Sequence, residues 1–317
     1  MKLFRYLVLG VFSFSLHAQE IKMYFPHFAG KSYDFIIFQG SESKTVMQGV
    51  IPENGYFQLK IPKDYSLYTG MSRWLITGTR EGGGLDMFVL GKDFSVSCDS
   101  DAPNEKNIVF KNNDSYKALN DLYREQEGIL KRYESMLFAT KSYPKTDKNY
   151  SNFQHEVLTQ KQSYNLFQDS LEKKGGYVGK FLQIVNLTRG KGNRIFENSS
   201  DEAENINHFI VNTLEWPLLY TSGHWTTVLN IWVGIHSDIF KDEKHFAKDF
   251  KTITSKIKSP EQYTDFVNRV LYSLRELGRD DYISVVNKSA IASGKYLGEL
   301  IEANNNNQVI SSFEVKQ

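Results

Sequence analysis

The only strong nucleophile in this sequence is Cys98, the one cysteine among 317 residues. A thiol does nucleophilic or redox chemistry when it is partly exposed and lies in a positively charged environment. Cys98 instead ends the alternating segment 94–98, shares a face with Phe94 and Val96, and precedes the acidic Asp99. This pattern predicts a buried structural side chain. One cysteine also excludes an intramolecular disulfide, a cysteine-based zinc site and a CxxC redox pair.

Histidines are the next candidates for catalysis or metal binding. None of the seven forms a tight metal-binding spacing such as HExxH. His236 and His245 flank a predicted helix boundary and could meet in space, but this spacing does not define a zinc site. We therefore predict no metal site and no cofactor.

Other catalytic motifs are also missing from the sequence. Gly82–Gly84 is not followed by the Lys-Ser/Thr of a phosphate-binding loop, and no GxSxG segment occurs. The adjacent acids Asp280 and Asp281 precede a predicted helix, where the helix dipole favours negative charge. No residue set predicts catalysis, so we expect a non-enzymatic protein.

Four aromatic residues form the most conspicuous local cluster: Trp216, Tyr220, Trp225 and Trp232. Aromatic side chains at such spacings usually belong to a hydrophobic core. The alternative is a surface that binds a small apolar or glycan ligand, or a protein partner. These four residues are the only candidate binding residues that the sequence offers.

The charge balance limits the classes of partner. There are 38 Lys and Arg residues against 37 Asp and Glu residues, which gives a formal charge of +1. This balance argues against nucleic acid or an anionic membrane surface as the partner. Hydrophobic residues make up 40% of the chain, which is ordinary for a folded protein with a sizeable core.

The first 18 residues have the pattern of a secretory signal peptide. Lys2 and Arg5 precede an apolar stretch at 6–16, and Ala18 is a suitable small residue for cleavage. The stretch is shorter than the ~20 residues that a spanning helix needs. No cysteine lies near the cleavage point, so a lipoprotein anchor is not expected. No later segment is long and apolar enough to span a membrane, and we expect export to the periplasm.

Residues 19–112 show the pattern of an antiparallel β-sandwich. Apolar residues alternate with polar ones in short segments, and the hairpin pair Asn54–Gly55 directly precedes one of them. Turn residues separate the segments at near-regular spacing, which is typical of sandwiches. The predicted strands are 21–25, 35–38, 57–61, 74–77, 87–90, 94–98 and 108–110.

Residues 113–303 change to a helical period of three to four. Asn113 or Asp114 suits the start of the first helix, and Pro260 and Gly278 suit the start and end of a later one. The chain is therefore predicted to have an α+β fold, with a β-sandwich followed by an all-α helical domain. No repeat of fixed period supports a solenoid. The predicted helices cover 116–137, 153–171, 178–187, 200–213, 226–236, 243–257, 260–277 and 280–292, with a short last helix ending at 303.

Residues 304–317 form the predicted linker and tail. Four consecutive asparagines at 304–307 are followed by Val309–Val315, whose composition is that of a lone strand or a tail.

Several segments together resemble a known family. They are Ala18–Gln19, Ile21–Gly30, Tyr33–Gly40, Gly49–Phe57 and Ser293–Lys295. Their strand pattern, domain order and local sequence are similar to those of the N-terminal portion of exported Bacteroidota proteins of the TlpA and alkyl-hydroperoxide-reductase-like thioredoxin family. The resemblance covers essentially the whole predicted mature chain. It implies a small β-sandwich, then helices, then a C-terminal thioredoxin domain.

The sequence departs from that family in its chemistry. A Trp-Cys-x-x-Cys segment carries out disulfide exchange in the family, whereas Cys98 is the only thiol here. Exchange needs an attacking thiolate and a resolving partner, so no catalytic residue can be carried over.

Three hypotheses for function follow from these observations. The first is a periplasmic interaction module, an accessory subunit of an outer-membrane or secretion assembly. The second is part of a thiol-disulfide oxidoreductase whose thioredoxin domain is missing or supplied by another chain. The third is a periplasmic binder of a small ligand, held in the aromatic region 216–232.

Overall fold

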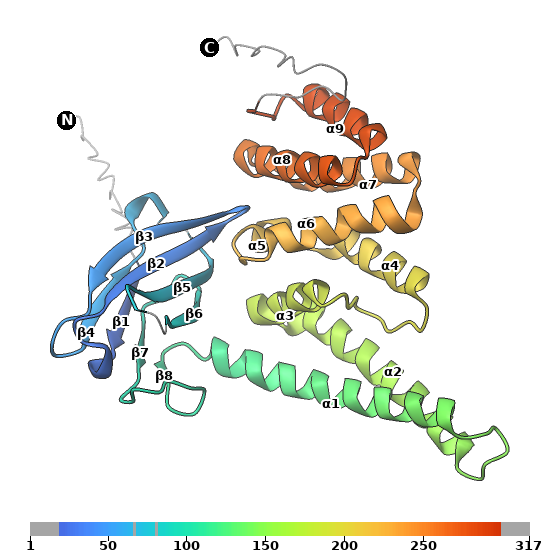
Figure 1. Cartoon of the computed structure of the whole chain (residues 1–317), viewed down its shortest axis with the longest axis horizontal. Helices are drawn as coiled ribbons and strands as arrows, with labels where there is room; N and C mark the ends of the chain where they lie inside the picture. Colours follow the sequence, from blue (N-terminus) through green and yellow to red (C-terminus); the bar gives the residue numbers. More distant parts are fainter. Residues whose placement is uncertain (1–18, 66–67, 80–81, 299–317) are drawn as a thin grey trace, which may run out of the picture.

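The computed structural model describes residues 19–65, 68–79 and 82–298. Figure 1 shows a β-sandwich beside a stack of helices, which confirms the α+β fold class. The predicted signal peptide at 1–18 and the predicted tail at 304–317 lie outside the described residues.

Two four-stranded sheets form the sandwich. In one sheet the order is β4 (Tyr56–Lys60), β1 (Glu20–Tyr24), β7 (Phe94–Ser97), β8 (Val109–Lys111). In the other sheet the order is β3 (Glu42–Val50), β2 (Ser32–Gln39), β5 (Gly70–Thr77), β6 (Gly84–Val89). All neighbouring strands are antiparallel except β1 and β7, which run parallel. This parallel pair departs from the otherwise antiparallel pairing that the sequence predicted, because residue alternation does not reveal strand direction.

The sandwich core consists of the residues that alternate inward from both sheets. Ile21, Phe35 and Leu59 are completely buried in it, and the rings of Phe25 and Trp74 lie 4.7 Å apart. Cys98 is 1% exposed and belongs to the same cluster, as its position at the end of an alternating strand predicted. Burial raises the pKa of its thiol, so Cys98 lacks the stabilised thiolate of a reactive cysteine.

Helices occupy the rest of the described chain. They are α1 (Ser115–Ser142), α2 (Tyr150–Lys174), α3 (Gly176–Thr188), α4 (Ser199–His208), α5 (Trp216–Tyr220), α6 (Trp225–Gly234), α7 (Glu243–Lys256), α8 (Pro260–Glu276) and α9 (Asp280–Ser293). Two π-helical segments follow α4 and α6, namely η3 (Phe209–Thr213) and η4 (Ile235–Phe240). Two 3₁₀ turns, η1 (Pro26–Phe28) and η2 (Lys63–Tyr65), lie in the sandwich.

The helices stack largely in chain order from α1 to α9 (Figure 1). The antiparallel pair α1 and α2, hereafter the α1–α2 hairpin, extends beyond the other helices in this view. Pro260 lies in the first turn of α8, as predicted, and the Ser259 side chain before it accepts a hydrogen bond from the Gln262 N–H. Asp114 precedes α1, as predicted, but its side chain makes no capping hydrogen bond.

The sandwich is attached to the helices by main-chain hydrogen bonds at the turn between α5 and α6. The Gly40 N–H donates to the Tyr220 carbonyl oxygen at 2.7 Å, and the Met71 N–H donates to the Thr221 carbonyl oxygen at 2.9 Å. Tyr68 reinforces this contact, since its hydroxyl lies 3.3 Å from the Thr221 oxygen and accepts a hydrogen bond from the Phe38 N–H. We call this contact the domain junction.

Glycines allow the close approach at the domain junction. A Cβ on Gly40 would overlap the Asp265 carboxylate and the Tyr220 ring, and a Cβ on Gly70 would lie 2.5 Å from the Thr221 Cβ. The Asp265 carboxylate also accepts a hydrogen bond from the Ser41 N–H at 2.8 Å. A side chain at Gly40 would therefore push the β2–β3 turn away from α8.

We expect Gly40→Ala to destabilise the protein by more than Gly30→Ala. Both glycines have positive φ angles, 60° and 77°, but a Cβ on Gly30 would meet no atom within 4 Å. Gly30→Ala should therefore cost only the backbone strain of about 1–2 kcal/mol. Gly40→Ala should add roughly 1–3 kcal/mol from steric overlap. Urea unfolding measures both changes, and equal losses would contradict the predicted role of Gly40.

Candidate functional site

The aromatic cluster predicted from the sequence lies inside the helical domain. Trp216, Trp225 and Trp232 are at most 1% exposed, and Tyr220 is half-buried beside the domain junction. The Trp216 and Trp225 rings meet edge to face, with centroids 5.7 Å apart. The three indoles therefore act as core side chains, and a ligand could reach them only if this core opened.

A buried polar network surrounds Trp232. Its indole N–H donates to Asn207 Oδ1 at 3.1 Å, and Asn207 Nδ2 donates to Asp249 Oδ2 at 2.7 Å. Asp249 is almost completely buried. Burial alone would raise the pKa of Asp249, but the contact with His236 and the hydrogen bond from Asn207 outweigh this effect, and the pKa is lowered.

Two histidines face the Asp249 carboxylate, so His236 and His245 do meet in space. Nε2 of His245 lies 3.1 Å from Asp249 Oδ2, and Nε2 of His236 lies 3.4 Å from the same atom. The longer contact lacks hydrogen-bond geometry and is mainly electrostatic. His236 is fully buried within η4, and burial lowers its pKa against the opposing influence of Asp249.

This histidine–aspartate network is closed to a substrate, because only the side chain of His245 is appreciably exposed. A general base must come within hydrogen-bonding distance of the group it deprotonates. The buried His236 cannot do so in this conformation. Its position instead suits a structural role, holding η4 against α7.

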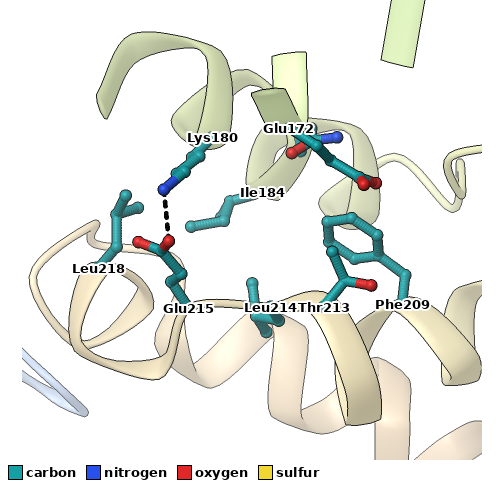
Figure 2. A pocket seen from close by; sticks show the side chains of 9 residues that line it. Glu172, Lys180, Ile184, Phe209, Thr213, Leu214, Glu215 and Leu218 are labelled. Carbon is teal, nitrogen blue, oxygen red and sulfur yellow. Dashed lines mark hydrogen bonds and ion pairs between the residues drawn. The ribbon is translucent and has the colours of Figure 1, made fainter. Parts of the chain in front are cut away.

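A small pocket opens where α3 faces η3 and α5. It has a volume of about 250 Å³. In Figure 2, Lys180 and Glu215 form an ion pair on one side, Glu172 lies on the other, and Ile184 and Leu214 lie between them. The pocket is lined by Glu172, Lys180, Gln183, Ile184, Phe209, Thr213, Leu214, Glu215 and Leu218. An apolar floor with charged groups at the rim is typical of a small-molecule site.

A larger groove runs between the two helices of the α1–α2 hairpin. Its volume is about 600 Å³, and its floor includes the buried residues Ile129 and Phe167. Leu166 lies at its edge and is 62% exposed. We call this feature the hairpin groove, lined by Arg124, Glu125, Gly128, Ile129, Arg132, Ser163, Leu166, Phe167 and Ser170.

Gly128 lies in the middle of α1 and lines the hairpin groove. A glycine inside a helix costs about 1 kcal/mol relative to alanine. A Cβ on Gly128 would meet only Arg132 Nη1, at the ordinary contact distance of 3.5 Å. Packing within the chain therefore does not require glycine here, whereas a partner lying in the groove would gain a closer approach.

Sequence reasoning missed both the pocket and the hairpin groove. The one available signal for the groove was Gly128, at the centre of the long predicted helix. A glycine inside a helix lowers its stability, so its presence points to a packing or functional role. The pocket residues come from four separate elements, so no local pattern connects them.

We expect the stability of the protein to fall as the pH is lowered from 7.5 to 5.5. An unfolded histidine binds a proton near pH 6.5, whereas the pKa of folded His236 is lower. The unfolded state therefore binds more protons in this range, and stability declines by up to about 1.4 kcal/mol per pH unit for this group. Urea unfolding at several pH values should show a shallower decline for His236→Gln.

The matched control is His155→Gln, since His155 lies exposed on α2. Burial also lowers the pKa of His224, so part of the decline should persist in His236→Gln. An unchanged slope in His236→Gln would show that His236 is not the group responsible.

Neither membrane spans nor metal clusters are found in the part of the chain that the structure describes. None of its helices is both long and apolar enough to cross a bilayer. Within the same residues, no three His, Cys, Asp or Glu side chains are arranged to hold a metal ion. No protein-family model, curated protein or solved structure matches this chain.

Proposed function

We propose that this chain is a non-enzymatic binding module that acts as an accessory subunit of an envelope assembly. The hairpin groove is the proposed contact with a protein partner. The observation that carries this proposal is Gly128, a helix-interior glycine that packing within the chain does not require.

The shape and charge of the hairpin groove suggest the kind of segment that would bind. An apolar floor of Ile129 and Phe167 between two antiparallel helices suits the apolar face of a helix from the partner. Arg124, Arg132 and Glu125 lie at the rim, where Arg124 pairs with Asp121. The rim charges are therefore close to balanced, and the apolar floor carries the proposed contact.

The proposed location is the periplasm. Export is expected from the basic, apolar and small-residue pattern of residues 1–18. The resemblance to exported Bacteroidota proteins of the TlpA-like family points to the same compartment. An outer-membrane or secretion complex is the proposed assembly.

We expect Leu166→Asp to abolish capture of the partner. A charge at this exposed position would make apolar docking unfavourable while leaving the fold intact, because Leu166 contributes little to the core. The measurement is a pull-down of the tagged chain from native envelope extract, with captured proteins identified by mass spectrometry. Ile291→Asp is the control, since Ile291 is also exposed but lies on α9.

Gly128→Ala separates binding from folding in the same assay. We expect it to stabilise the chain by about 0.5–1 kcal/mol while reducing capture. Gly234→Ala is its control, because Gly234 also lies in a helix with space for a Cβ and is not part of the groove. Equal capture by all four variants and the unchanged chain would refute the hairpin groove as the contact.

A second candidate function is small-ligand binding in the pocket of Figure 2. The pocket adjoins the predicted aromatic region, since Leu214 and Glu215 directly precede Trp216. Its two carboxylates outnumber its one ammonium group, so an apolar ligand with a positively charged end would fit. A cavity of about 250 Å³ limits this ligand to a small molecule.

We expect hexylammonium, used as a probe, to change tryptophan fluorescence in a saturable manner. The reason is that Trp216 follows the pocket residue Glu215 and would sense a change in its surroundings. Ile184→Trp should fill the floor and remove the response to the probe. Leu277→Trp, at an exposed position outside the pocket, is the control. A response that persists in Ile184→Trp would place the probe elsewhere.

Participation in a thiol-disulfide oxidoreductase is the weakest proposal. Cys98 is buried and the pKa of its thiol is raised. A redox role would therefore need a CxxC protein that binds this chain and performs the exchange.

A further inference from the structure

The outer edge of β3 is the longest free strand edge in the described part of the sandwich. β3 has nine residues, while the other edge strands, β4, β6 and β8, have five, six and three. Along its outer side, no described strand pairs with β3. An edge strand presents unpaired N–H and C=O groups, which can pair with an added strand.

The side chains of β3 also leave apolar surface incompletely covered. Val46 and Met47 are half-buried against the sandwich core, and Val50 is 59% exposed. An additional strand along β3 would cover this flank of the core. The added strand would be stabilised both by main-chain hydrogen bonds and by burial of apolar surface.

The described chain ends close to the beginning of β3. The Leu297 N–H donates to Thr264 Oγ1 at 2.9 Å, which holds the segment after α9 against α8. The next residue on α8, Asp265, accepts the hydrogen bond from the Ser41 N–H in the β2–β3 turn. The last described residues therefore lie near Glu42, the first residue of β3.

The sequence beyond this point contains a segment suited to a strand edge. In Val309–Val315, one face of an extended chain would carry Val309, Ser311, Phe313 and Val315. The ten residues 299–308 can reach about 35 Å, and a nine-residue strand is about 30 Å long. The beginning of β3 is thus within reach.

We propose that Val309–Val315 of the same chain adds to the outer edge of β3 as a fifth strand of that sheet. Only β3 is long enough among the described edges to pair with all seven residues, and the last described residues lie near its beginning. The added strand would protect the edge from pairing with other molecules.

Hydrogen exchange read by mass spectrometry tests this proposal. The full chain is compared with a chain that ends at Ala303. We expect amides in 42–50 to exchange at least about ten-fold more slowly in the full chain, because the outward-facing amides gain partners. The matched control is β4, another edge strand, whose exchange should not change.

A proline variant links the protection to strand pairing. Ser312→Pro should remove the protection of 42–50, because proline cannot donate a hydrogen bond and disrupts a paired strand. Asn306→Pro, in the connecting segment, should leave it in place. Equal exchange in the full and shortened chains would overturn the proposal. Protection that grows with protein concentration would also overturn it, because a second copy would then supply the strand.

Discussion

The carbonyl oxygens of Tyr220 and Thr221 hold two neighbouring strands of the sandwich against the helical domain. They accept main-chain hydrogen bonds from Gly40 and Met71, at the adjacent ends of β2 and β5. Main-chain groups cannot move independently of their strands or helices. The contact therefore fixes an orientation more strictly than exposed side chains would.

Apolar packing extends this contact along α3. The Phe88 ring on β6 meets the Phe181 ring edge to face, with centroids 5.1 Å apart, and Tyr177 packs against the same ring. The two parts thus share a small core of their own. The hairpin groove and the pocket of Figure 2 both belong to the helical domain, which these two contacts fix to the sandwich. A bound partner would therefore meet a preformed surface.

Much of the fold was predictable because its signals are local. The pair Asn54–Gly55 marks the turn before β4, and Pro260 marks the start of α8. The strand β3 was not predicted, because a bulge opposite Phe35 and Ile36 breaks the alternation of its few apolar residues. The π-helical segment η3 was predicted as ordinary helix, and only the first two residues of η4 lay in a predicted helix, since nothing in residue type reports a wider turn. The role of the tryptophans could not be decided from spacing, which is the same for a core and for a surface.

The parallel pairing of β1 with β7 has a consequence for how the chain folds. β1 lies in the interior of its sheet, and Ile21 pairs with Phe94, 73 positions further along. Such non-local pairings slow folding, because the entropy of closing a long loop is lost before the contacts form. During synthesis β1 can pair with β4, but its other edge stays unpaired until β7 has been made. The early intermediate would therefore expose an apolar strand, which is the type of segment that chaperones bind.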